Sequence, residues 1–83
     1  MRAKRTDATH RAVIQALRKC GWAVVDTHEA PGWVDCAAMR FGEVRLIEIK
    51  TAKGKLTDSQ NKLIEQGWPI HILTSPEDAA ALR

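Results

Sequence analysis

Asp35, Glu48 and Lys50 are charged residues whose types and spacing suit chemistry on a phosphate group. Asp35 lies in a predicted strand, residues 33–39, and the other two lie in the next, residues 44–50, which is rich in β-branched and aliphatic residues. Side chains alternate between the faces of a strand, so Glu48 and Lys50 share a face. Because such groups are costly to bury unless they are paired or reactive, the pattern predicts a functional site.

A divalent metal ion would explain why two carboxylates lie together. We expect Asp35 and Glu48 to face each other across the two strands, where their charges repel unless a cation lies between them. Magnesium favours carboxylates, a backbone carbonyl and retained waters, and the carbonyl of Ile49 is placed to be the backbone ligand. Such an ion polarises a phosphodiester and lowers the pKa of a bound water. Lys50 would orient that water or neutralise the developing charge.

Each of these residues also has a simpler structural interpretation. Asp35 could end a strand, and Glu48 and Lys50 could form an exposed ion pair of little energetic value. Gln60, on the helix that follows, is explained by capping alone. The joint pattern favours function because the spacing, the strand placement and the following helix agree.

Basic residues near this pattern could hold the phosphates of a nucleic acid. Lys53 and Lys55 lie in the loop that follows the strand of Glu48. Arg11, Gln15 and Arg18 form an outward row on the first helix, for which a solvated face is the default and phosphate contact the alternative. The net charge of +3 is compatible with a polyanionic partner but does not require one.

The remaining elements follow from caps, turns and hydrophobic spacing. A basic arm of residues 1–5, expected to be mobile, precedes a helix from Thr6 or Asp7 to about Cys20. Strands are predicted at 22–26 and 68–73, beside the two already named, and a hairpin turn at 41–43. Thr57 and Gln60 have the form of a capping box for a helix to about Gln66, and Ser75 caps a short last helix. The order predicts one α/β domain, a mixed sheet flanked by helices.

The histidines and cysteines give weaker signals. His10 lies on the inward stripe of the first helix with Val13 and Leu17, where a satisfied buried histidine is the simpler interpretation. Cys20 and Cys36 have neither zinc spacing nor the density of a disulfide scaffold, so we expect two buried thiols in a reducing cytosol. No apolar run approaches the ~20 residues of a membrane span, and we expect neither a signal peptide nor a membrane partner.

Three stretches of the chain together resemble the VRR-NUC domain (virus-type replication-repair nuclease) of the PD-(D/E)xK nuclease superfamily. They are Pro31 to Asp35, Ile47 to Lys50, and the Lys-Gly-Lys-Leu run from Lys53 to Gln60. The resemblance implies an α-β-β-β-α-β core and a Mg²⁺- or Mn²⁺-dependent nuclease that acts on DNA. It assigns Asp35 and Glu48 to metal binding, Lys50 to catalysis and Gln60 to the site.

Small stand-alone members of this group resemble phage-encoded proteins and archaeal Holliday-junction resolvases, which act as homodimers in DNA repair or recombination. The resemblance therefore implies branched DNA as substrate, a homodimer, and the cytoplasm, that of the host if the protein is phage-encoded. Many relatives carry a Glu on the first helix, and His10 lies in its place. A histidine suits manganese better than magnesium, so the metal preference stays open.

Three functions remain in competition. The leading one is a structure-specific endonuclease, in which some of Trp22, Trp33 and Trp68 could serve a dimer interface. The second is a module on a nuclease fold that binds DNA or recruits a partner without catalysis. The third is an interaction protein unrelated to nucleic acid, which predicts no metal-dependent stability and no salt-sensitive DNA binding.

Overall fold

The fold is an α/β arrangement of a mixed sheet with helices on both faces. The computed structural model describes residues 4–51 and 54–83, with side chains from residue 8 onward. Within these ranges the elements are α1 (Lys4–Lys19), β1 (Ala23–Asp26), β2 (Cys36–Arg40), β3 (Glu43–Ile49), α2 (Asp58–Glu65), β4 (Ile70–Leu73) and α3 (Pro76–Ala81). The predicted element order and fold class are confirmed.

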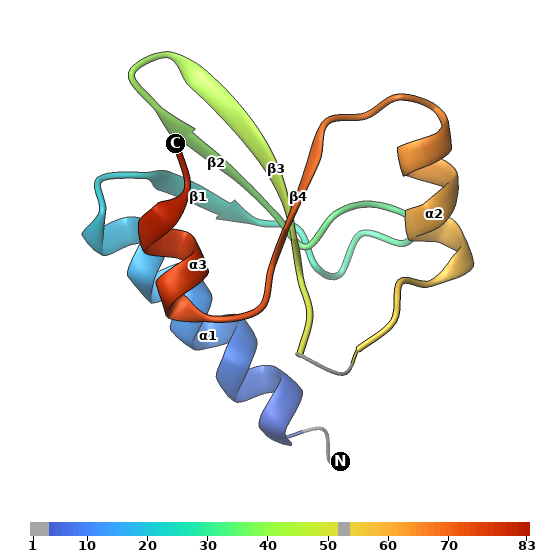
Figure 1. The fold of residues 1–83 in the computed structure, drawn as a ribbon, viewed down its shortest axis with the longest axis horizontal. Coiled ribbons are helices and arrows are strands. Elements are labelled where there is room, and N and C mark those ends of the chain that lie inside the picture. The colour runs from blue at the N-terminus through green and yellow to red at the C-terminus, as the bar shows by residue number, and fades with distance from the viewer. Residues whose placement is uncertain (1–3, 52–53) are drawn as a thin grey trace.

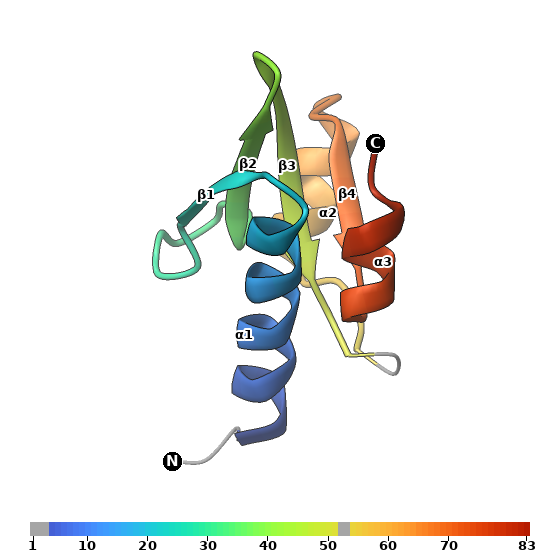
Figure 2. The same cartoon turned by 90° about the vertical axis from the view of Figure 1, so that its left-hand side faces the viewer.

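The four strands lie in the order β1-β2-β3-β4. β2 is antiparallel to both β1 and β3, whereas β3 and β4 are parallel because α2 carries the chain back across the sheet. Helices α1 and α3 cover one face, and α2 lies on the other (Figures 1 and 2). Among the described residues, no helix is both long and apolar enough to cross a membrane.

The core lies between α1 and the sheet. Val13 and Leu17 project from the helix at the predicted spacing and are fully buried. They belong to one apolar cluster with Cys36 of β2 and with Ile47 and Ile49 of β3. The odd-numbered positions of β3 therefore face α1, which leaves the even-numbered ones, Glu48 among them, to the opposite face.

The β2–β3 hairpin closes through a two-residue turn. Phe41 and Gly42 both have positive φ angles, 55° and 78°, the requirement of a type I′ turn. Arg40, just before the turn, places its guanidinium 4.2 Å from the ring centre of the buried Trp22.

Trp33 and the half-exposed Trp68 pack edge to face with ring centres 5.1 Å apart.

Three predicted boundaries are wrong by two residues or more. β4 begins at Ile70 instead of residue 68. Helix α1 begins at Lys4, so Lys4 and Arg5 are not part of an arm, and residues 1–3 lie outside the described residues. Lysine and arginine are good helix formers, which explains how the helix extends past Thr6. β2 begins at Cys36 instead of residue 33, because Thr27 binds the preceding segment: its hydroxyl donates to the carbonyl of Val34 at 2.8 Å.

Candidate functional site

Asp35 is held in one orientation at the start of β2. Its amide donates to the carbonyl of Ile47 (3.1 Å), and its own carbonyl accepts from the amide of Thr27 (2.8 Å). Its carboxylate accepts a hydrogen bond from the amide of Ile49 at 2.8 Å. Asp35 thus continues the β2–β3 register by one residue and stands opposite Glu48, as the sequence predicts.

Glu48 is the single buried charged residue among the side chains described, with 1% exposure. Its Oε1 accepts from the amide of Asp35 at 3.0 Å, while Oε2 has no hydrogen-bond partner within the described chain. Burial and the nearby Asp35 carboxylate raise the pKa of Glu48 from its ordinary value of 4.5 to about 7, although the charge of Lys50 opposes this shift. A buried oxygen without a partner is costly, so this carboxylate needs a proton or a cation.

The backbone of Ile49 adds a third oxygen to this place. The β2–β3 ladder ends at the pair Cys36–Ile47, so Ile49 has no opposite residue in β2. The amide of Ile49 donates to the Asp35 carboxylate. Because the N–H and C=O of one strand residue point to the same side, the carbonyl of Ile49 points toward Asp35 as well. Two carboxylates and a carbonyl are oxygen donors that Mg²⁺ or Mn²⁺ prefers, so the residues fit a hard divalent ion.

A cavity of about 590 Å³ opens beside these groups. Asp35, Ile49 and Lys50 form its wall at the end of the sheet. The opposite wall comes from α1, including the exposed Arg11, Gln15 and Arg18 of the predicted outward row, and from the end of β1; its residues are His10, Arg11, Ile14, Gln15, Arg18, Asp26 and His28. Asp35 lines this space and the buried Glu48 behind it does not, but cationic groups lie on both walls, so the space can receive a phosphate beside the Asp35 carboxylate.

Two other residues of the predicted site lie elsewhere in the described chain, and a third is not among the described residues. Gln60 completes the capping box of α2. Its side-chain oxygen accepts a hydrogen bond from the backbone amide of Thr57 at 2.8 Å, and its backbone amide donates to the Thr57 hydroxyl at 3.2 Å. The predicted capping box is therefore confirmed, and Gln60 is not among the residues that line the cavity in the described ranges. Lys55 is exposed in its loop and likewise does not line it, and Lys53 lies outside the described residues.

The capping role gives a test of Gln60. We expect Thr57→Ala and Gln60→Ala each to lower the free energy of unfolding by about 1 kcal/mol, since each removes half of the capping box. Thermal unfolding measures this, and both variants should keep any activity of the wild type. If Gln60→Ala alone abolished that activity, Gln60 would belong to the site as the resemblance implies.

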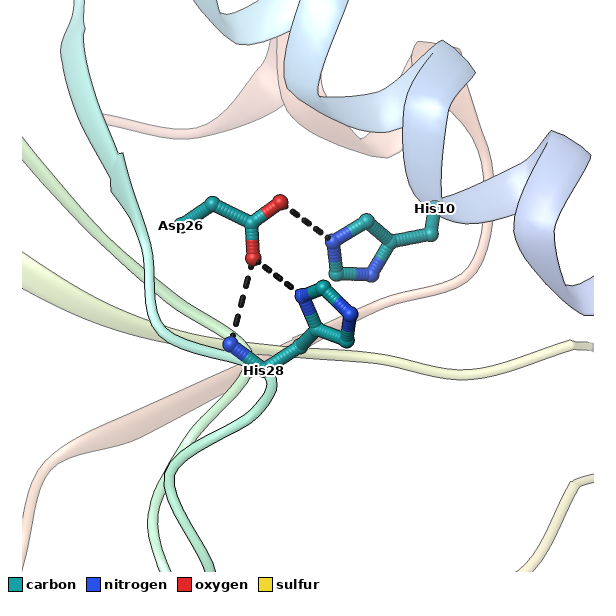
Figure 3. Close-up of side chains that lie close together, drawn as sticks. All are labelled: His10, Asp26 and His28. Atoms are coloured by element: carbon teal, nitrogen blue, oxygen red, sulfur yellow. Dashed lines mark hydrogen bonds and ion pairs between the residues drawn. The ribbon is translucent and has the colours of Figure 1, made fainter.

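The structure adds two residues that the sequence did not single out, Asp26 and His28 (Figure 3). His10 Nε2 lies 3.1 Å from Asp26 Oδ2, and His28 Nδ1 lies 2.7 Å from Asp26 Oδ1. Partial burial opposes ionisation of Asp26, but the hydrogen bonds from His28 and His10 prevail and lower its pKa to about 2. The bond to Asp26 in turn raises the pKa of His28. The Asp-x-His spacing at a strand end was the signal in the sequence.

His10 therefore contacts Asp26 by a hydrogen bond instead of standing free beside Asp35 and Glu48. Its side chain is 19% exposed and lines the cavity, so His10 has a hydrogen-bond partner, as the simpler interpretation predicts, but it is half-buried instead of buried. No family model matches the chain, and no curated protein matches it either. Function is therefore inferred from the side chains and their positions.

Proposed function

We propose that the protein is a metal-dependent endonuclease that hydrolyses phosphodiester bonds in DNA, the activity that its resemblance to the VRR-NUC domain implies. One observation carries the proposal: the Glu48 carboxylate is buried against Asp35 with one oxygen unpartnered in the described chain. Two adjacent carboxylates, one of them buried, destabilise the folded state by charge repulsion and desolvation, and a bound cation offsets both effects. Asp35, Glu48 and the carbonyl of Ile49 would hold Mg²⁺ or Mn²⁺.

The other residues of the cavity have roles that follow from their charge and position. A bound Mg²⁺ or Mn²⁺ supplies polarisation of the phosphate and acidification of a bound water. Lys50, whose amide is anchored to the carbonyl of Leu73 at 3.0 Å, presents its ammonium group to the charge that develops on the phosphate. Arg11 and Arg18 are exposed on the opposite wall, where they can bind flanking phosphates.

The proposal extends to a homodimer acting on branched DNA. Val25, Met39 and Val44 lie on the sheet face opposite α1 and are 64%, 44% and 58% exposed. Adjacent exposed apolar side chains on a sheet are typical of a protein interface. A dimer through this face would present two cavities to one substrate, which suits a junction with two equivalent strands.

Charge placed on this sheet face should weaken the dimer. We expect Val25→Lys to raise its dissociation constant by about tenfold or more, because the lysine would bring an unpaired charge into an apolar contact. Sedimentation analysis of the wild type and the variant measures this. Lys62→Ala, on the exposed side of α2, is the control, and a wild type that stays monomeric at high concentration would contradict the dimer.

A second candidate is a DNA-binding module without catalysis. It is favoured by two placements: Gln60 serves as a helix cap, and His10 is engaged with Asp26 instead of the carboxylate pair. This candidate keeps the basic cavity walls and predicts salt-sensitive DNA binding. It gives no reason for the buried Glu48 beside Asp35, and for that reason we rank it second.

A cleavage assay separates the candidates. Labelled four-way junction, flap, duplex and single-stranded DNA are incubated with the protein in Mg²⁺, Mn²⁺ or EDTA, beside Asp35→Asn and Lys62→Ala. We expect cuts that need the metal, persist in Lys62→Ala and vanish in Asp35→Asn, with the preferred DNA naming the substrate. Binding of DNA without cuts in any metal would favour the second candidate, and absence of both would exclude the two together.

A further inference from the structure

His10, Asp26 and His28 form a cluster that the proposed nuclease reaction does not use. We propose that these three side chains bind one transition-metal ion of the Zn²⁺ class, at a site separate from the Asp35–Glu48 pair. The inference rests on the cluster itself and holds whether or not the protein cleaves DNA.

The donor atoms are already close enough to share an ion. One ligand atom from each residue lies within 4.8 Å of the other two. Zinc bonds to histidine nitrogen and carboxylate oxygen are about 2.0–2.2 Å long, so donors around one ion lie about 3–4 Å apart. The nitrogens of His10 and His28 lie 3.1 and 2.7 Å from the carboxylate oxygens of Asp26, so the three side chains need to move only slightly to surround one ion.

The three ligands come from elements that the fold fixes against one another. His10 lies on α1, Asp26 is the last residue of β1, and His28 follows in the next loop. The amide of His28 donates to Asp26 Oδ1 at 3.1 Å, which ties this loop to the strand end. The two imidazole rings meet edge to face, with centres 4.9 Å apart (Figure 3). An ion would thus bind a prearranged set of donors.

The surroundings of the cluster suit a transition metal better than magnesium. Two imidazole nitrogens and one carboxylate are a donor set found in zinc sites, whereas magnesium prefers oxygen alone.

The site would keep one coordination position open. All three residues line the cavity that also holds Asp35 and Lys50. A tetrahedral ion with three protein ligands has a fourth position for an exchangeable water or an anionic oxygen. The alternative is a purely structural cluster, in which Asp26 accepts hydrogen bonds from two histidines, and it predicts no saturable metal binding.

Cobalt is a spectroscopic probe for such a site, because tetrahedral Co²⁺ absorbs visible light and Zn²⁺ displaces it. The full chain is titrated with Co²⁺ as the wild type and as His10→Ala and His28→Ala. His28 has a half-exposed side chain in a loop, so its substitution should leave the fold intact, which circular dichroism checks. His71→Ala is the matched control, since His71 lies on β4, and Cys20→Ser tests for thiolate binding.

We expect the wild type, His71→Ala and Cys20→Ser to bind one tetrahedral Co²⁺ per chain, counted from its visible band, with release by Zn²⁺; an ion held by oxygen ligands at Asp35 and Glu48 would not be tetrahedral and would not add to this band. His28→Ala and His10→Ala should bind it more than about tenfold more weakly, since loss even of an outer partner costs 10–100-fold in metal affinity. Asp35→Asn should bind Co²⁺ like the wild type. The proposal is overturned if His28→Ala retains wild-type affinity, if the wild type shows no saturable band, or if Asp35→Asn loses the ion.

Discussion

Glu48→Gln is expected to make the metal-free protein more stable at pH 8. The folded-state pKa of Glu48, about 7, lies above its ordinary value of 4.5, so the folded protein binds this proton more tightly than the unfolded chain. The free energy of unfolding must then fall as the pH rises from about 4.5 to about 7. Since one pKa unit corresponds to about 1.4 kcal/mol, the loss is on the order of 3 kcal/mol, and glutamine avoids it.

Denaturant unfolding in EDTA at pH 4.5 and pH 8 measures this effect. The wild type and Glu48→Gln should be similar at the lower pH and differ at the higher one. Addition of Mg²⁺ or Mn²⁺ at pH 8 should then stabilise the wild type and not the variant, because binding to the folded state alone adds to its stability. Asp58→Asn, an exposed acid at the start of α2, is the control. If the free energy of unfolding depended on pH equally in the wild type and in Glu48→Gln, Glu48 would not have a raised pKa in the folded protein.

Lys50→Ala is expected to lower DNA cleavage by about 10²-fold or more, the usual cost of losing one group that stabilises transition-state charge. DNA binding and the stability of the fold should change little, because the Lys50 side chain is half-buried at the edge of the cavity and its amide bond to Leu73 remains. Lys50→Arg keeps the charge in a different geometry and should recover only part of the rate.

Single-turnover cleavage rates, measured beside DNA affinity, test this role of Lys50. Lys62→Ala removes an exposed lysine from α2 and should cleave like the wild type. A proportional loss of affinity and rate in Lys50→Ala would assign the residue to DNA binding. A variant that cleaves as fast as the wild type would remove Lys50 from the site.

Local chemistry explains which parts of the fold the sequence predicts well. The capping box depends on two residues three apart, Thr57 and Gln60, and the hairpin turn depends on Phe41-Gly42. The approach of Asp35 to Glu48 also follows from sequence, because a hairpin fixes which residues of its two strands are opposite. These features require no knowledge of how distant elements pack.

The remaining features depend on long-range packing. Alternation along β3 puts Glu48 on one face but does not say that this carboxylate is buried to 1% exposure. The start of β2 is set by the bonds between Thr27 and the segment before Cys36. The meeting of His10 with Asp26 depends on how α1 crosses the end of β1, which no spacing within either element reveals.

An ion held by Asp35 and Glu48 is tested by comparing cleavage by the wild type and by Glu48→Gln in Mg²⁺ or Mn²⁺. Both are assayed on the DNA that the wild type prefers, beside their stabilities in EDTA at pH 8. Glu48→Gln should be more stable than the wild type and yet inactive, a combination that damage to the fold cannot produce. A Glu48→Gln variant that cleaves DNA at the wild-type rate would contradict a catalytic ion held by Asp35 and Glu48.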